Sequence, residues 1–408
     1  MFSFSSFAPN KGICSKHWLI SACLVFLTVF FFLTSSGSTK LRQTVQTAKD
    51  TFSTQSDSCS VALASQVDLL KSEYSKLLNG VTHVAMIGFP FHGRRLIPKR
   101  RNKGDSAIWS GEVMILEALG IEIVHICIDM NVCDNPLIRT TLEEYGGPTK
   151  TAILFHGGGN FGDIWHNEQE NRERVVVDFH DYRIRSFPQT YKFYQEANLV
   201  QAQKIYGDHP DLQLTARDTK SFMALERDFG KKHKLSLLPD AATMLHTSPL
   251  LATAPKQSDL DFLFLARTDG EGSQNHWNDQ TMIEELLYVT NENGTLDAAN
   301  MTIRDWIDEE PVGILEKSLN EQAQMRVDWC YDFLGQGALI IADRLHAHIL
   351  STVWGIDHIT VEEGSYAKLS TYHDTWLRDC GQRVRTTTSV REAVDAAKDW
   401  YKRGKSFS

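Results

Sequence analysis

Short, continuously apolar runs alternate along the chain with stretches of helical periodicity. The runs that we predict to be strands cover residues 83–88, 121–129, 151–156, 212–217 and 235–239, and then 261–267, 338–343 and 358–361. Apolar runs that are continuous rather than alternating are typical of parallel strands covered by helices on both faces. The pattern therefore predicts an α/β protein with parallel sheets.

Residues 246–258 interrupt this alternation with two prolines and several small polar side chains, as an interdomain linker would. The roughly 350 residues after the unusual N-terminal region suit two domains of about 100–200 residues each. We predict Rossmann-like domains at 61–245 and 259–388 that face a cleft, the arrangement called GT-B. A C-terminal helix within 389–408 begins with a capping box from Ser389 to Glu392.

The N-terminal region indicates a membrane anchor and a stem. No residue from Trp18 to Leu33 is charged, and a helix over 18–35 spans about 27 Å at ~1.5 Å per residue, enough for a thin bilayer. We interpret it as a signal-anchor that follows a cytoplasmic tail (1–17). A cleaved signal peptide is the alternative, whereas a buried core helix would carry a polar face. Residues 36–60 are rich in Ser and Thr and predict a flexible stem.

Two glycosylation sequons suggest where the large C-terminal region lies. Asn293 and Asn300 begin Asn-Gly-Thr and Asn-Met-Thr. Together with the anchor and the stem, they favour a single-pass type II protein of the Golgi membrane whose catalytic region is lumenal. Five of the seven cysteines lie beyond the anchor. Cys127 and Cys133 are candidates to pair in that oxidising compartment, and the odd number leaves at least one thiol unpaired.

Composition excludes several classes of protein. The chain is 42% hydrophobic and 23% charged, so it is neither disordered nor fibrous. Its net charge of −9 argues against a nucleic-acid partner. Because the chain has no Cys-x-x-Cys pair and no His-Glu-x-x-His motif, we expect no bound metal.

Three predicted strand-to-helix junctions carry the candidate chemistry, at residues 102–109, 156–165 and 343–349. In open α/β sheets, ligands bind at the carboxyl ends of the strands, where helix N-termini favour anions. The glycines at 157–159 would let a ligand approach the backbone closely.

Each junction also has a purely structural interpretation. Asp105 and Asp343 are suited to capping helices, and three successive glycines often form a simple turn. His346 and His348 are candidate core histidines. They make a poor chelating pair, because helical residues i and i+2 point to different faces.

In combination, these segments resemble the polysaccharide pyruvyltransferase family. The segments are NKGDSAI, HGGGNFGDIW, RSFPQT, TARD, FLAR and DRLHAHILSTVWGIDHI, and the resemblance runs from about residue 81 to about residue 380. The residues around Lys368 (SYAK) are similar to the family's lysine-bearing loop. Asp357 stands where the family usually has proline, which changes a turn but removes no chemical group.

The resemblance implies that pyruvate passes from phosphoenolpyruvate to a sugar as a cyclic ketal, commonly on O4 and O6 of galactose. It implies His346 as general acid and Asp105 as general base, and Arg217, Arg344 and Leu345 as donor-binding residues. Phosphoenolpyruvate is then a co-substrate, and no cofactor is needed. Further candidates for shaping the cleft or binding the acceptor glycan are Asn102, Gly158, Gly159, Asn160, Asp163, Gln189, Arg267 and Lys368.

Two rival functions stay open at this point. A GT-B nucleotide-sugar glycosyltransferase is the first, because Asp259-Leu-Asp261 matches a metal-binding DxD motif; the motif leads directly into a predicted strand, which favours a chance match. The second is an inactive, lectin-like module. It would be expected to lack the arginines or the histidine of the clustered positions, whereas this chain keeps Arg217, Arg344 and His346.

Overall fold

The computed structural model describes residues 58–88, 102–127, 133–252, 260–268, 283–363 and 367–407. All of them lie in one compact unit, Ser58–Ser408. The predicted cytoplasmic tail, the predicted anchor and residues 36–57 of the predicted stem fall outside the described residues. Within the described part of the chain, no helix is both long and apolar enough to cross a membrane.

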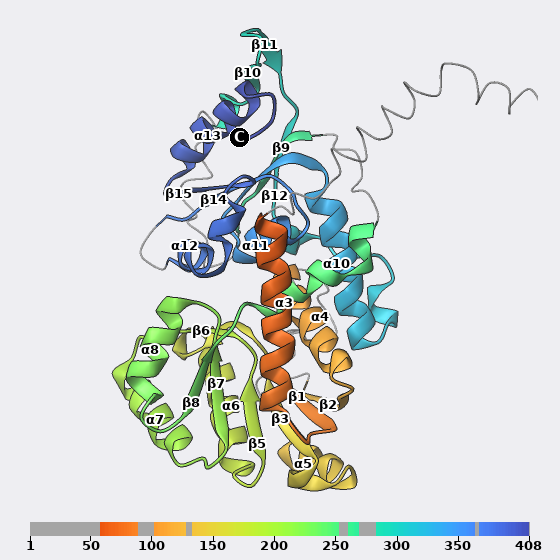
Figure 1. Cartoon of the computed structure of the whole chain (residues 1–408), viewed down its shortest axis with the longest axis vertical. Coiled ribbons are helices and arrows are strands. Elements are labelled where there is room, and N and C mark those ends of the chain that lie inside the picture. Colours follow the sequence, from red (N-terminus) through yellow and green to blue (C-terminus); the bar gives the residue numbers. More distant parts are fainter. Residues whose placement is uncertain are drawn as a thin grey trace, which may run out of the picture. The chain divides into compact units, whose positions relative to one another are not determined.

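The first half of the unit is built on an eight-stranded sheet with the order β2-β1-β3-β5-β7-β6-β4, in which β8 also pairs with β7 (Figure 1). Every pairing in this sheet is parallel. The strands are β1 (His83–Ile87), β2 (Glu122–Cys127), β3 (Thr151–Phe155), β4 (Gly158–Phe161), β5 (Arg183–Ser186), β6 (Gln189–Tyr191), β7 (Leu212–Ala216) and β8 (Lys234–Leu237). The five strands predicted here from apolar runs are confirmed.

Helices surround this sheet. They are α3 (Ser58–Leu77), α4 (Lys103–Ala118), α5 (Asn135–Glu144), α6 (His166–Asp178), α7 (Glu196–Gly207) and α8 (Thr219–Phe229), with short 3-10 helices η1 (Gly147–Thr149), η2 (Asp163–Trp165), η3 (Ala241–Thr247) and η4 (Pro249–Ala252). Because helices pack on both sides, the central strand β3 is buried along its whole length.

The second half is a five-stranded parallel sheet with the order β12-β9-β13-β14-β15. Its strands are β9 (Leu260–Leu265), β12 (Met301–Arg304), β13 (Gly337–Ala342), β14 (His358–Val361) and β15 (Val384–Thr387), and an antiparallel hairpin joins β10 (Tyr288–Thr290) to β11 (Leu296–Ala298). The three strands predicted in this half are also confirmed. The chain is therefore an α/β protein with parallel sheets.

The helices of the second half include α13 (Val390–Lys402), where Ser389 caps the first turn; the Glu392 carboxylate of the predicted capping box accepts the backbone N–H of Thr388 instead of Ser389. The others are α10 (Leu319–Leu334), α11 (Leu345–Val353) and α12 (Lys368–Tyr372), followed by a π-helical turn η7 (His373–Leu377) and the 3-10 helices η5 (Trp306–Asp308), η6 (Ile314–Glu316) and η8 (Arg378–Cys380). We call residues 58–252 the first lobe and residues 260–407 the second lobe.

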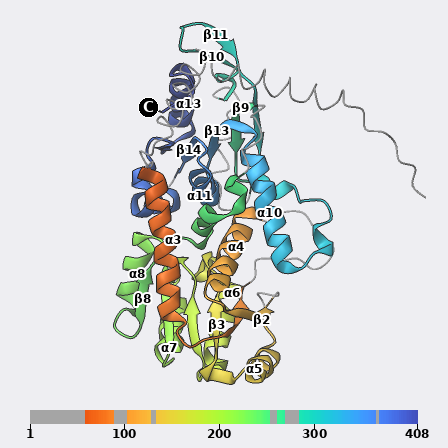
Figure 2. The same ribbon diagram turned by 45° about the vertical axis from the view of Figure 1, so that its right-hand side comes forward.

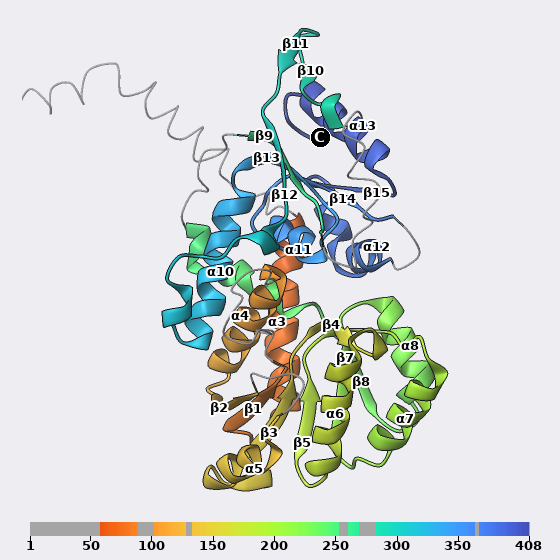
Figure 3. The ribbon, with the colours of Figure 1, turned by 180° about the vertical axis from the view of Figure 1, so that it is seen from behind.

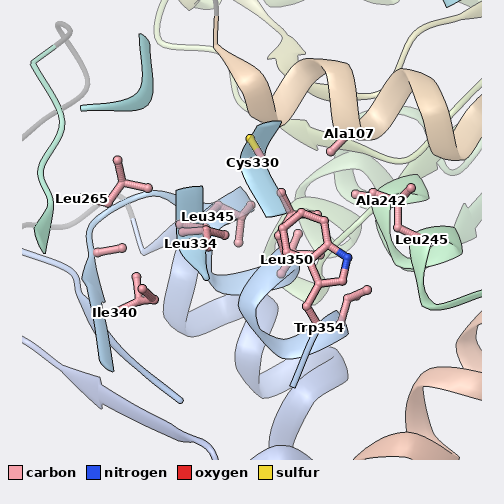
Figure 4. Close-up of a cluster of buried hydrophobic side chains, with 14 of the residues drawn as sticks. Ala107, Ala242, Leu245, Leu265, Cys330, Leu334, Ile340, Leu345, Leu350 and Trp354 are labelled. Atoms are coloured by element: carbon pink, nitrogen blue, oxygen red, sulfur yellow. The ribbon is translucent and has the colours of Figure 1, made fainter. Parts of the chain in front are cut away.

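One hydrophobic core joins the two lobes. Ala107 of α4 and Leu245 of η3 pack in the same buried cluster as Leu345 and Leu350 of α11 (Figure 4). Helix α10 of the second lobe lies beside α4 of the first (Figure 2). The lobes are therefore held in contact by apolar packing as well as by the connecting chain.

Helix α3 extends the folded region beyond the predicted boundary at residue 61. It begins at Ser58, so the last three residues assigned to the stem are helical. Cys59 is buried and forms a disulfide with Cys380, a pairing that the sequence did not predict. The predicted pair Cys127–Cys133 is a disulfide, and Cys330 is a free, buried thiol.

The predicted linker also begins later than expected. Residues 246–247 complete η3, and Pro249–Ala252 form η4. Leu245, directly before them, is part of the shared core. Residues 253–258 of the predicted linker lie outside the described residues.

Candidate active site

His346 lies where the two lobes meet, in the first turn of α11. Its ring packs on the backbone of Gly104 in the first turn of α4, and any Cβ at residue 104 would overlap the imidazole Nδ1. The glycine of the NKGD segment is therefore needed so that this histidine can approach α4. Two of the three predicted strand-to-helix junctions meet at this contact (Figure 3).

A buried carboxylate, Asp240, joins His346 to Arg217. Its Oδ2 accepts a hydrogen bond from Arg217 Nη1 at 2.8 Å and lies 3.5 Å from His346 Nε2. Burial opposes the charge of this carboxylate, but the neighbouring His346 and Arg217 outweigh it and hold the pKa of Asp240 well below its usual range. His346 Nε2 has no hydrogen-bond partner among the described residues.

Lys368 completes this group from the second lobe. A Cβ on Gly159 would lie 3.3 Å from Lys368 Nζ and 3.6 Å from Arg217 Nη2, so both cations border that glycine. Lys368 opens α12 directly after Ala367, whose φ of 52° is left-handed. Such a conformation is costly for a residue with a Cβ and is common at functional sites. The cluster thus gathers two cations and an imidazole around the glycine-rich loop.

Asp105 follows Gly104 in α4, but it does not cap that helix. Asn102 is the N-cap, and its side chain accepts a hydrogen bond from the backbone N–H of Gly104. The Asn102 amide also donates to Asp105 Oδ1 at 3.0 Å. The capping interpretation of Asp105 is therefore wrong, and Asn102 instead orients the predicted base.

Arg344 is more constrained than its predicted role as an anion clamp implied. It forms a bidentate ion pair with buried Asp305, with Nε–Oδ1 at 2.9 Å and Nη2–Oδ2 at 2.6 Å. Leu345 packs its side chain into the shared core (Figure 4). Donor binding by Arg344 and Leu345 stays a prediction.

A second buried pair, Glu112 and His156, holds the start of the glycine-rich loop. Glu112 of α4 bonds His156 Nδ1 at 2.8 Å and accepts the backbone N–H of Gly157 at 2.7 Å. Burial raises the pKa of Glu112; at His156 burial acts in the opposite direction, but the Glu112 carboxylate prevails and raises that pKa too. The contact of Glu112 with His156 and with the backbone of Gly157 ties the glycine-rich loop to α4.

The next residues of the loop are also held from within the protein. Gln189 Nε2 donates to the carbonyl of His156 at 2.7 Å and to Asn160 Oδ1 at 3.2 Å. Arg172 bonds both the carbonyl and the side-chain oxygen of Asn160. Gly158 has a φ of 99°, which favours glycine. Gln189 and Asn160 thus shape the loop, as one of their predicted roles requires.

Two further predicted residues, Asp163 and Arg267, take part in contacts between elements. Both carboxylate oxygens of Asp163 accept backbone N–H groups, from Tyr194 and from Gln195, each at 2.7 Å. The backbone N–H of Arg267 donates to Asp343 Oδ1 at 3.0 Å. Asp343 therefore joins the ends of two strands; the N-cap of α11 is Arg344.

The second histidine of α11 is a core residue, as its structural interpretation predicted. His348 is fully buried, and its Nδ1 lies 2.7 Å from His358 Nε2. Across the described ranges, no group of three or more His, Cys, Asp or Glu side chains is arranged to hold a metal ion.

Sequence reasoning missed the carboxylates that position the predicted residues. Asp240 directly follows the predicted strand 235–239 and lies three residues after the end of β8, so its place at the carboxyl end of a strand was a usable signal. Asp305, which follows the unpredicted strand β12, and Glu112, which lies inside α4, carried no such signal, because their partners come from distant parts of the chain.

Comparison with known proteins identifies the family to which this site belongs. The family model described as polysaccharide pyruvyl transferase matches residues 102–365. Pyruvyl transferase 1 of Schizosaccharomyces pombe is 35% identical over 356 residues, which are 86% of this chain and 84% of that protein. The chain belongs to the polysaccharide pyruvyl transferase family. Its membership supports pyruvate transfer to a polysaccharide as its general activity.

Two further matches also cover about three quarters or more of this chain. General stress protein 30 of Bacillus subtilis is 25% identical over 315 residues, covering 75% of this chain and 81% of that protein. The crystal structure of an uncharacterised Klebsiella pneumoniae protein superposes with a TM-score of 0.50 at 14% identity, covering 79% of this chain and 99% of that one. The structural match supports the α/β fold alone.

The structure shows that Asp261, one of the two carboxylates of the DxD motif on which the glycosyltransferase alternative rests, has a structural role. Asp261 lies within β9, where its Oδ2 accepts the backbone N–H of Asn300 and its Oδ1 pairs with Lys405. Asp259, the other half of the DxD motif, lies outside the described residues. The carboxylate of Asp261 thus serves the second lobe's own packing.

Proposed function

We propose that the protein transfers pyruvate from phosphoenolpyruvate to a terminal galactose of a glycan, forming a cyclic ketal and releasing phosphate. The observation that carries the proposal is the meeting of His346, Arg217 and Lys368 beside the glycine-rich loop and the first turn of α4. Phosphoenolpyruvate bears a phosphate and a carboxylate, and both need cations and N–H donors. The two parallel sheets on either side of this group suit a GT-B-like cleft.

The reaction divides between an acid and a base. Asp105 accepts the proton of a sugar hydroxyl, whose oxygen then bonds to C2 of phosphoenolpyruvate, while His346 donates a proton to the methylene carbon. The bond from C2 to the phosphate oxygen then breaks, and phosphate leaves. The second hydroxyl then bonds to C2 and passes its proton to His346, which gave up its own in the first step, and this closes the ketal.

Asp240 enters this scheme as a positioning residue. Its carboxylate contacts both the proposed acid, His346, and the proposed donor-binding residue, Arg217. These contacts hold the imidazole and the guanidinium in fixed positions relative to each other, as the proposed reaction requires.

The proposal also places the enzyme in the Golgi membrane, with a type II anchor and a lumenal catalytic region. Two disulfides support an oxidising compartment. Asn293 and Asn300, the predicted glycosylation sites, are both exposed on the second lobe. Digestion of the cellular protein with an N-glycosidase tests this part: an unchanged mobility on a gel would contradict glycosylation at these sites.

The reaction itself is tested with the purified full chain, phosphoenolpyruvate and a panel of β-galactosides. We expect the acceptor to gain the mass of one pyruvate ketal while an equal amount of phosphate is released. Turnover of a UDP-sugar with no response to phosphoenolpyruvate would contradict the proposal.

A further inference from the structure

Two large aromatic side chains are exposed beyond the ends of neighbouring strands in the first lobe. Trp165 ends η2, shortly after β4, and its exposed fraction is 47%; Tyr194 follows β6, and its exposed fraction is 56%. Strands β4 and β6 pair in parallel, with Phe161 opposite Tyr191. The two segments therefore leave the sheet next to each other, and the aromatic residues belong to one surface.

The two segments are fastened together by Asp163. Its Oδ1 accepts the backbone N–H of Tyr194, and its Oδ2 accepts the backbone N–H of Gln195 and the side-chain amide of Asn198. At Gly162, any Cβ would overlap the carbonyl of Lys192, so the segments touch there too. This surface is preorganised, and a ligand that bound to it would lose little affinity to ordering the protein.

The chemistry of this surface suits a sugar ring. The C–H face of a pyranose stacks on aromatic rings, and its hydroxyls need polar partners at the edge. Lys192 Nζ lies 4.2 Å from the centre of the Tyr194 ring, and the neighbouring His166 and Asn167 are exposed. A protein helix or a membrane would need a wider apolar face than Trp165, Tyr194 and the partly exposed Ile164 supply among polar neighbours.

The surface is connected to the candidate active site by β4. Gly159, which borders Lys368 and Arg217, is the second residue of β4, and Trp165 follows six residues later. Six residues at ~3.3 Å each reach at most about 20 Å. A ligand on Trp165 therefore lies within about 20 Å of the glycine that borders Lys368 and Arg217.

We infer that Trp165 and Tyr194 form an acceptor subsite that stacks the pyranose units next to the sugar that is modified. This inference rests on the proposed function, and it extends it: the substrate is an oligosaccharide or polysaccharide chain, and a free monosaccharide reaches only part of the site.

Kinetics of the full chain with two acceptors test the inference. The acceptors are methyl β-galactoside and a tetrasaccharide that ends in β-galactose, and the variants are Trp165→Ala and Tyr194→Ala. We expect each variant to raise the KM for the tetrasaccharide about three- to tenfold, the range typical of one aromatic contact. The KM for phosphoenolpyruvate and the turnover of methyl β-galactoside should stay unchanged.

The matched control is Tyr288→Ala, because Tyr288 is also exposed, at 65%, but lies on β10 of the second lobe. It should behave as wild type with both acceptors. Unchanged tetrasaccharide kinetics in the Trp165 and Tyr194 variants would overturn the inference, as would an equal loss with both acceptors.

A binding measurement separates failure of this inference from failure of the proposed function. If the wild type transfers pyruvate to neither acceptor, the proposed function fails. Saturation-transfer NMR of the tetrasaccharide without phosphoenolpyruvate then still tests the surface: loss of signal in Trp165→Ala supports the subsite, and retention of the full signal overturns it.

Discussion

At the scale of single residues, Asp240 fixes two of the side chains on which the proposed reaction depends. Its carboxylate is fully buried, bonds Arg217 and the backbone N–H of Ala242, and lies next to His346. Because a buried carboxylate is stable only with such partners, the three side chains are best understood as one unit. Substitution of any member therefore tests the others.

The Asp240→Asn variant removes the charge and keeps the shape. We expect kcat to fall by about 10–100-fold, a part of the ~10²–10⁴ that general acid catalysis contributes, and the KM for phosphoenolpyruvate to rise because Arg217 loses its ionic partner. Steady-state kinetics measure both effects. Asp240→Glu, which restores the charge, should recover part of kcat; equal loss in both variants would indicate a packing role instead.

His346→Ala and His348→Ala compare a proposed acid with a core residue on one helix. His346→Ala should lose ~10²–10⁴ of the rate with a nearly unchanged melting temperature. His348→Ala should lose about 1–3 kcal/mol of unfolding free energy, because a cavity remains and Nε2 of His358 loses its partner. A folded His346→Ala enzyme with more than about a tenth of wild-type turnover would contradict the acid assignment.

At the scale of helices and strands, the contact between α4 and α11 sets the geometry of the site. Alanine is normally a better helix residue than glycine, so Gly104→Ala would be harmless without His346. In the structure the new methyl overlaps the imidazole. We expect kcat to fall well below that of Gly381→Ala, where the nearest atom to the added Cβ is 3.7 Å away. Equal activity of the two variants would show that His346 tolerates displacement.

The elements that the sequence predicted and those that it missed differ in how their strands are stabilised. Apolar runs such as β3 and β13 were predictable because their burial depends on their own side chains. Strand β5 has the sequence RIRS, and its buried Arg185 is stabilised by an ion pair with Asp211, which directly precedes β7. Strand β4 contains two glycines and is held by side chains from other elements. Such strands depend on partners that only the fold brings together.

The residues of the candidate site also fall into a predicted group and a group that was missed. The resemblance of motifs predicted His346, Arg217 and Lys368, and the structure brings them together. The partners Asp240 and Asp305 were not predicted, since a buried ion pair joins residues 23 to 39 positions apart. Motifs thus point to the groups that react, and the fold supplies the groups that hold them.

The histidine pair between α11 and β14 predicts how stability depends on pH. Burial lowers the pKa of His358 to about 4 and lowers the pKa of His348 well below its usual value. The unfolded chain therefore takes up protons first as the pH falls below about 6.5. Stability should be complete at higher pH and decrease as the pH falls toward 4, by at most about 1.4 kcal/mol per pH unit for each histidine.

Chemical denaturation at a series of pH values measures this slope. His348→Gln should be less stable at neutral pH but should show a shallower decrease. The matched control is His166→Gln, because His166 is exposed at the start of α6. A wild-type stability that does not change between pH 6.5 and pH 4 would contradict the neutral, buried pair.

At the scale of the whole described unit, α3 links the N-terminal end of the fold to its C-terminal part. Cys59 is joined to Cys380 across 321 positions of sequence, Ser58 Oγ donates to the carbonyl of Asp379, and Gln66 Nε2 donates to the carbonyl of Trp376. The rest of α3 packs on the first lobe, through buried side chains such as Leu70. Helix α3 therefore holds the two lobes together, in addition to the core at α4 and α11.

Two truncations of the chain test this link. The fragment 58–408 keeps Cys59 and should unfold at the same denaturant concentration as the full chain. The fragment 61–408 loses the disulfide and should be less stable by about 2–5 kcal/mol, because the cross-link closes a very long loop and so restricts the unfolded chain strongly. Cys59→Ser in the full chain should match the shorter fragment. Cys133→Ser, which opens a disulfide between residues only six positions apart, should cost less. Equal stability of the two fragments in oxidising buffer would mean that the lobes are held by the shared core alone.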